Sequence, residues 1–272
     1  MPRIKVNGAE LEIRERGSGQ PVVFIHGSMG DECAAVVKER VLADHYRVID
    51  YHRRGWGNSS RAEDVVSISQ QAVDCRAVIE HIGVQRAHFV GQSYGGIILL
   101  QLALDAPETV QSLALQEPPL PSVLYNSPAF GSLAERAGAM YGSGDKAGAI
   151  EAFATEMGGD DFRAAFDQTM PPGYFERWVE AADTLFQSEI PSLQGWVFTR
   201  DDAARITQPV LNMVGANTRA YFREVHDTIG AWLPHPENLE LPDATHAALQ
   251  TNPRGAAERL AAFFSSHSME GD

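Results

Sequence analysis

Cysteine is scarce in this chain. Its 272 residues include only Cys33 and Cys75. Two cysteines do not make a disulfide framework, and such sparse usage fits a reducing compartment. Cys75 falls in a predicted buried helix and Cys33 in the segment after a predicted strand, so neither is expected to carry chemistry.

Long apolar runs are also missing. The N-terminal sequence MPRIKVNGAE has no apolar segment of the kind found in secretory signals, and no run approaches the length of a transmembrane helix. We therefore expect a soluble, cytoplasmic protein with no membrane partner. We further expect it to be a monomer or a homodimer.

Positive charge is in deficit. The chain has 22 Lys and Arg residues against 36 Asp and Glu residues, which gives a formal net charge of -14. A surface of this sign repels phosphate backbones. The composition therefore argues against a nucleic-acid partner.

Metal-ligand and cofactor motifs are absent as well. The nine histidines form no H-x-x-x-H or H-E-x-x-H pattern and no cluster with cysteine. No phosphate-binding glycine loop is present either. We therefore expect neither a catalytic metal nor an organic cofactor.

Alternating strand and helix patterns occupy most of the chain. Apolar runs that end at turn residues predict buried parallel strands, a 3.6-residue apolar period predicts helices, and Asn7-Gly8 predicts a hairpin. The predicted strands cover 21–27, 46–55, 87–93, 110–116, 209–215 and 238–246, and the clearest predicted helices cover 65–82, 219–232 and 253–266. This order indicates an α/β fold whose central sheet is mostly parallel, with helices on both faces.

One long interval has no convincing strand. Between about residues 120 and 205 the sequence shows only helical patterns and turns. We expect this interval to be a helical cap inserted after the strand that follows the nucleophile helix. The predicted domains are thus a core of residues 1–119 and 206–272 and a cap of residues 120–205.

The strongest chemical motif is Gly91-Gln92-Ser93-Tyr94-Gly95, a match to G-x-S-x-G. It follows an apolar strand and opens a helix, which is the context that gives the motif its meaning. Glycines two residues before and after the serine relieve crowding in a tight strand-to-helix turn. The Ser93 hydroxyl then stands clear of the sheet edge, so the motif predicts a serine nucleophile.

Together with two other segments, this motif resembles the α/β-hydrolase superfamily. His26-Gly27 directly follows a predicted strand, and the run DYHRRGWGNS (50–59) is similar to the family's D-x-R/P-G-x-G-x-S segment. The resemblance covers about residues 4 to 265. It implies the α/β-hydrolase fold and an enzyme with a serine mechanism, but it fixes no substrate.

His246 is the predicted base. The family's order along the chain is serine, acid, histidine, and His246 alone lies at the end of the last predicted strand segment, in LPDATH. An imidazole is well placed to transfer protons near pH 7. His26, by contrast, is interpreted as a structural residue that braces the neighbouring loop.

The family resemblance also implies an oxyanion hole made of backbone N–H groups. One donor is the residue after the nucleophile, here Tyr94, and the other lies in the loop after the strand that ends in His26-Gly27. In that loop Ser28 is the first candidate and Met29 the next.

The triad acid is missing from its usual position. After the strand 209–215 the chain reads GANTR, without a carboxylate. Glu224 and Asp227, the nearest downstream, fall on a predicted helix. Asp243 is only three residues before His246, which is poor geometry for orienting that ring.

Glu117 is the alternative acid. It directly follows the strand 110–116, at the sheet edge where Ser93 is expected, and Pro118 and Pro119 stiffen the chain after it. Some members of the superfamily place the acid there, among them the zearalenone-type lactone hydrolases. The local resemblance to that group rests on the EPP segment, the VGANT segment and the GDEC segment at 30–33. The predicted triad is therefore Ser93, His246 and Glu117.

Bulky side chains of the interval 120–205 suggest an apolar pocket over Ser93. Trp178 and Phe186, with Met29, are the predicted substrate-binding residues. A small hydrophobic ester or lactone is the expected substrate. Two alternatives stay open: hydrolysis of a carbon–carbon bond in a vinylogous diketone, and a ligand receptor with little turnover.

Overall fold

A computed structural model describes residues 2–269 and contains one eight-stranded sheet with the strand order β1-β2-β4-β3-β5-β6-β7-β8. The strands are β1 (Arg3–Val6), β2 (Ala9–Arg16), β3 (Gln20–Ile25), β4 (Tyr46–Tyr51), β5 (Ala87–Gln92), β6 (Val110–Gln116), β7 (Val210–Gly215) and β8 (Pro236–Leu241). β2 pairs antiparallel with both β1 and β4, and every other pair is parallel. This architecture confirms the predicted α/β-hydrolase fold.

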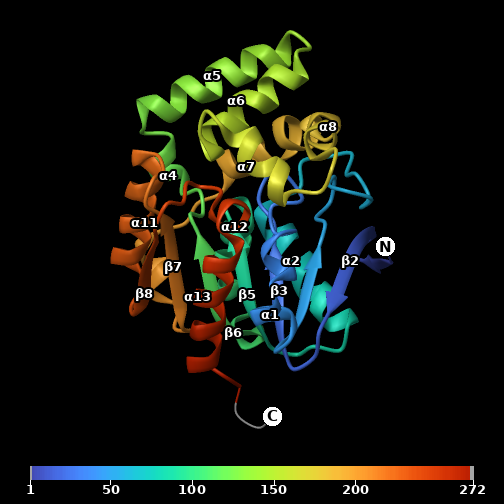
Figure 1. Cartoon of the computed structure of the whole chain (residues 1–272), viewed down its shortest axis with the longest axis vertical. Helices are drawn as coiled ribbons and strands as arrows, with labels where there is room; N and C mark the ends of the chain where they lie inside the picture. The colour runs from blue at the N-terminus through green and yellow to red at the C-terminus, as the bar shows by residue number, and fades with distance from the viewer. Residues whose placement is uncertain (1, 270–272) are drawn as a thin grey trace.

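The central strands are buried on both faces, as their continuous apolar sequences require. One apolar cluster joins the sheet to helices α2 (Ile68–His81), α3 (Tyr94–Asp105) and α11 (Ala220–Trp232). A second cluster joins the sheet to η1 (Val36–Lys38), α12 (Ala248–Thr251) and α13 (Pro253–Ser266). α13 and the short α1 (Arg40–Ala43) lie in front of the sheet in Figure 1, whereas α2 lies behind it. Because helices cover both faces of the sheet, the site must lie where the strands end.

Two strands are shorter than predicted, for local reasons. The segment 46–55 leaves the sheet after Tyr51 and turns at Gly55, which has a φ of 82°. The segment 238–246 ends its strand at Leu241, because Pro242 follows and Asp243 turns the chain with a φ of 55°. His246 is therefore carried by a loop.

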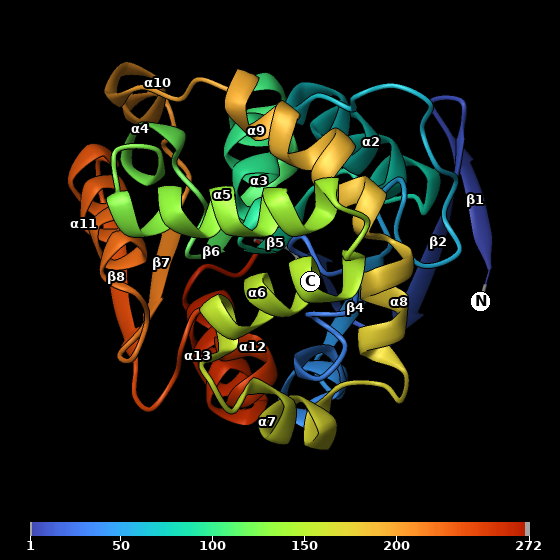
Figure 2. The same ribbon diagram turned by 90° about the horizontal axis from the view of Figure 1, so that it is seen from above.

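Between β6 and β7 the chain forms only helices and their connections. They are α4 (Pro121–Leu124), α5 (Pro128–Gly142), α6 (Lys146–Gly158), α7 (Phe162–Thr169), α8 (Tyr174–Glu180), the π-helical turn η3 (Thr184–Glu189), α9 (Ile190–Gly195) and α10 (Arg200–Ala204). α5 and α6 pack along each other above the carboxyl ends of the parallel strands (Figures 1 and 2). We call residues 120–205 the helical insert. Its side chains form an apolar cluster of their own, with contributions from Met29 and Ala247.

No helix among residues 2–269 combines the length and the apolar character needed to cross a lipid bilayer.

Candidate active site

Ser93 lies at the turn between β5 and α3. Its backbone has φ 50° and ψ −121°, a strained conformation for a residue with a side chain. The turn is possible because the neighbouring glycines leave room: a Cβ on Gly91 would lie 2.7 Å from the Cα of Gly96, and one on Gly95 would collide with the carbonyl oxygen of Ile25. Glycine at 91 is thus required by the local turn, and glycine at 95 by the close approach of the chain at Ile25.

Glu117 follows β6, the strand next to β5, and is fully buried. Its Oε1 accepts a hydrogen bond from the N–H of Gly215 (2.8 Å). Its Oε2 accepts from the hydroxyl of Thr218 (2.7 Å) and pairs with Nδ1 of His246 (2.7 Å). Two donors besides the histidine therefore hold this carboxylate in one orientation. The structure brings together the two residues predicted to be acid and base.

The ring of His246 presents a free nitrogen. Because the Glu117 carboxylate only accepts hydrogen bonds, Nδ1 must carry a proton, which leaves Nε2 as the acceptor in the neutral ring. Nε2 is buried and has no partner among the described residues, Ser93 included. Phe222 stacks on the ring with a centroid distance of 3.8 Å and an interplanar angle of 17°. The ring is thus fixed by a carboxylate and an aromatic face. A hydrogen bond from a serine to such a nitrogen is often long before substrate binds.

The loop after β3 runs against the serine turn. A Cβ on Gly27 would lie 3.1 Å from the Cβ of Ser93, which is tighter than an ordinary van der Waals contact. Ser28 and Tyr94 both line the same pocket as Ser93. The predicted oxyanion donors therefore gather around the predicted nucleophile.

Glu32, which the sequence analysis does not single out, bears on the choice between Ser28 and Met29. The N–H of Met29 donates to Oε1 of Glu32 at 2.8 Å, so it is already engaged. The prediction that Ser28 is the donor of this loop is compatible with this contact. Burial raises the pKa of Glu32 to about 7. The only feature of the sequence that points to Glu32 is its place in the GDEC run at 30–33.

Arg53 joins this loop to the helical insert and is completely buried. Its side chain donates to the carbonyl oxygens of Gly27 (2.6 Å) and His26 (3.2 Å), and its N–H donates to Nε2 of His26 (2.9 Å). His26 thus braces the loop, as predicted. Nη1 of Arg53 lies 2.7 Å from Oε1 of Glu189, which belongs to the insert.

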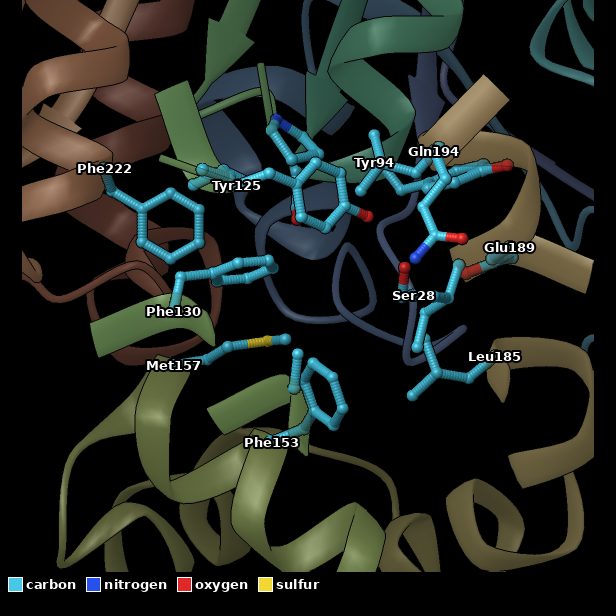
Figure 3. Close-up of a pocket in the computed structure, with 16 residues that line it drawn as sticks. Ser28, Tyr94, Tyr125, Phe130, Phe153, Met157, Leu185, Glu189, Gln194 and Phe222 are labelled. Atoms are coloured by element: carbon cyan, nitrogen blue, oxygen red, sulfur yellow. The ribbon is translucent and has the colours of Figure 1, made fainter. Parts of the chain in front are cut away.

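The pocket above Ser93 is mainly apolar (Figure 3). It is lined by Ser28, Ser93, Tyr94, Pro119, Leu124, Tyr125, Phe130, Ala134, Phe153, Met157, Leu185, Glu189, Ile190, Leu193, Gln194 and Phe222. Most of these side chains belong to the helical insert. An apolar ligand can therefore be held between the insert and the serine turn.

The three residues predicted to bind substrate do not line this pocket. Met29 and Trp178 are buried inside the apolar cluster of the insert, where Trp178 packs against Tyr174 with a centroid distance of 4.8 Å. Phe186 stacks on Tyr141 (4.3 Å), behind the lining residue Phe153. The structure therefore does not place these three in the lining, because bulk alone does not show which face of a helix meets the pocket.

Elsewhere, His52 lies buried between two carboxylates. Nδ1 pairs with Glu12 (2.8 Å) and Nε2 with Asp31 (3.1 Å). Because the carboxylates bind opposite nitrogens of the ring, the three groups do not converge on one point. Among residues 2–269, no group of three or more His, Cys, Asp and Glu side chains is arranged to hold a metal ion.

Comparison with known proteins agrees with this architecture. A family model described as the alpha/beta hydrolase fold matches residues 20–253. The dihydrolipoyllysine-residue acetyltransferase component of the acetoin cleaving system of Cupriavidus necator is 36% identical over 114 residues, which are 42% of this chain and 30% of that protein. The chain spans less than half the length of the curated relatives it matches.

Two solved structures show the same fold over nearly the whole chain. Est816, described as an N-acyl homoserine lactone degrading enzyme, has a TM-score of 0.77 at 23% identity and covers 96% of this chain and 100% of that one. The enol-lactonase from Burkholderia xenovorans LB400 has a TM-score of 0.81 at 19% identity, with coverage of 97% and 100%.

Proposed function

The chain belongs to the α/β-hydrolase family, and from this premise we propose that it cleaves a carboxylic ester or lactone of a hydrophobic small molecule through an acyl-enzyme. The observation that carries the proposal is the Glu117–His246 pair. Nδ1 of His246 lies 2.7 Å from Oε2 of Glu117, and Nε2 of His246 has no partner among the described residues. This is the arrangement that a serine nucleophile needs from its base.

In the proposed reaction Ser93 Oγ attacks the substrate carbonyl carbon while its proton passes to Nε2 of His246. The N–H groups of Ser28 and Tyr94 stabilise the alkoxide that forms, and Glu117 stabilises the imidazolium. The imidazolium then returns its proton to the departing alcohol as the C–O bond breaks. Water, activated by the same histidine, hydrolyses the acyl-enzyme.

We also propose that the helical insert acts as a cap domain, which selects the substrate. Insert residues supply much of the lining, among them Phe130, Phe153 and Met157. A mainly apolar wall favours a hydrophobic acyl or alcohol group and offers few partners for a sugar or a peptide. The uncharged ester or lactone of a hydrophobic molecule is the class that fits.

The test is labelling and turnover on one preparation. A fluorophosphonate should add once per chain, at Ser93 by intact-mass and peptide mass spectrometry, and p-nitrophenyl butyrate should be hydrolysed with an initial burst. Ser93→Ala should lose both the adduct and the hydrolysis. Turnover at the wild-type level in Ser93→Ala would exclude this mechanism. Stoichiometric ligand binding without hydrolysis of any ester or lactone would instead favour a receptor.

A further inference from the structure

One side of the apolar pocket carries polar groups. Figure 3 shows Ser28, Gln194 and Glu189 on one side of the pocket and Phe222 and Phe130 on the other. Buried polar atoms in proteins nearly always have hydrogen-bond partners. The partners of this polar side therefore indicate what the pocket is built to receive.

Glu189 is held firmly by one oxygen only. Its Oε1 accepts from Nε1 of Trp56 (2.7 Å) and lies 2.7 Å from Nη1 of Arg53. The residue is 2% exposed. Its Oε2 is buried and has no partner among the described residues. Oε1 is thus engaged by Trp56 and approached by Nη1 of Arg53, which itself makes no hydrogen bond among the described residues, and Oε2 is left to meet a donor from another molecule.

The backbone around Glu189 places it in the wall of the pocket. It is the last residue of the π-helical turn η3, directly before α9. Pro191 lacks an N–H and so disturbs the regular α-helical pattern at this point. Leu185, Ile190 and Leu193 of the same stretch also line the pocket, so Glu189 sits within a continuous lining face.

Tyr94 supplies a second unpartnered polar atom. Its hydroxyl is buried and makes no hydrogen bond of good geometry among the described residues; the Ser192 hydroxyl beside it is buried and unpartnered in the same way, and the Tyr94 side chain lines the pocket. The guanidinium of Arg53 lies 4.8 Å from the centroid of its ring. Burial raises the pKa of Tyr94, so the phenol keeps its proton and is able to donate it to a hydrogen bond. A hydroxyl group of a ligand both donates and accepts, whereas an amide N–H only donates.

We propose that Glu189 and the Tyr94 hydroxyl form a polar subsite that binds a hydroxyl group of the substrate. In this subsite the ligand hydroxyl donates to Oε2 of Glu189 and accepts from Tyr94. The substrate is then an apolar ester or lactone with a hydroxyl group distant from the bond that is cleaved. This inference rests on the proposed function and names the substrate class of that site.

The test compares esters that differ only at the distant group. p-Nitrophenyl esters of phenylacetic, phenylpropionic and phenylbutyric acids are prepared with a para hydroxyl, a para methoxy or an unsubstituted ring. The common leaving group keeps intrinsic reactivity matched. For at least one chain length, kcat/KM of the wild-type protein should be about 10- to 100-fold higher for the hydroxyl than for the methoxy ester, as expected for a hydrogen bond to a charged group.

Two variants locate the preference. Glu189→Gln should reduce the hydroxyl-to-methoxy ratio about tenfold, with Glu176→Gln, an exposed glutamate of the same insert, as its control. If Glu189→Gln fails to fold, Tyr94→Phe carries the test, because it leaves the Arg53–Glu189 pair intact. It should also lower the ratio, while Tyr46→Phe on the far side of the core should not.

The outcomes separate this inference from the proposed function. Esters that are hydrolysed through Ser93 with a hydroxyl-to-methoxy ratio near one at every length would overturn the subsite and leave the serine mechanism standing. A ratio that both variants leave at its wild-type value would do the same. Hydrolysis that survives in Ser93→Ala would overturn the proposed function itself.

Discussion

His246 and His52 are both buried histidines paired with a glutamate, yet they are built differently. His246 is held at Nδ1 by Glu117, and its Nε2 is free. His52 is held at both nitrogens, by Glu12 and Asp31. A base needs one nitrogen available to a substrate proton, whereas a doubly paired ring can only hold structure together. The free nitrogen, and not the carboxylate partner, distinguishes His246 from His52.

The surroundings of the two rings differ in the same sense. His246 stacks on Phe222, which lines the same pocket as Ser93. His52 belongs to a charged network that includes Arg14 and reaches Arg177 of the helical insert through Asp31 (3.0 Å). The first pair is arranged for proton transfer, and the second connects the core to the insert. The same kind of substitution should therefore affect activity at one pair and stability at the other.

The largest effect is expected from Glu117→Gln. An amide keeps the size of the side chain, but it carries no charge to stabilise the imidazolium and can favour the wrong tautomer of His246. We expect kcat to fall by about 10³ to 10⁴, as removal of an orienting carboxylate does in other triads. Steady-state kinetics on p-nitrophenyl butyrate measures it, and thermal unfolding checks the fold. Glu12→Gln, the same change at the other pair, should leave kcat within about threefold.

This prediction has a definite contrary result. Asn217→Ala and Asp243→Asn should be far milder than Glu117→Gln. Full turnover in Glu117→Gln, with inactive Glu224 or Asp227 variants, would move the acid onto α11. Both of those side chains are exposed in the structure, so we do not expect this.

A smaller effect, on stability and not on turnover, is expected from His52→Leu. The change leaves the buried carboxylates of Glu12 and Asp31 without their shared partner, and breaking a buried pair in this way costs about 3 kcal/mol. Urea denaturation should show that loss in the free energy of unfolding, while kcat stays within about threefold of wild type. A stable but inactive His52→Leu protein would mean that this cluster takes part in the chemistry.

The smallest expected effect is a pH dependence of the stability that His52→Leu loses. Hydrogen bonding by His52 lowers the pKa of Glu12 to about 2; burial would raise the pKa of Asp31, but the same histidine lowers it to about 2. Burial alone would lower the pKa of His52, but hydrogen bonds to Asp31 and Glu12 raise it above 6.5. The carboxylates stabilise the fold above their ordinary pKa values of 4.5 and 3.8, and they lose this effect as the pH falls toward 2. The charged histidine stabilises it below 6.5 and loses its effect as the pH rises through its raised pKa.

The difference in unfolding free energy between wild type and His52→Leu should therefore be greatest between about pH 4.5 and 6.5. It should shrink on both sides of that window. Urea denaturation of both proteins from pH 3 to 9 measures it. A difference that grows as the pH rises through 6.5 and stays high above pH 8 would show that His52 is neutral in the folded protein.

By itself the sequence determined the fold and the turn at Ser93. The apolar strands specify a buried parallel sheet, and the crowding that requires glycine at 91 comes from Gly95 and Gly96, within the motif and the residue after it. Glu117 was also within reach, since elimination needed only the order of the strands and the absence of a carboxylate after β7. Steric contacts between neighbouring residues and the order of the strands can be predicted from the amino-acid sequence alone.

Only the tertiary structure decided what surrounds that turn. The choice of Ser28 over Met29 depends on a side-chain contact from Glu32, and Glu189 reaches Arg53 from 136 positions away in the chain. Trp178 lies in the apolar cluster of the insert and outside the pocket lining, because the pocket-facing side of a helix is set by how the helices of the insert pack. The hydrophobicity of a side chain predicts that it is buried. Which residues it packs against depends on contacts between segments that are distant in the sequence.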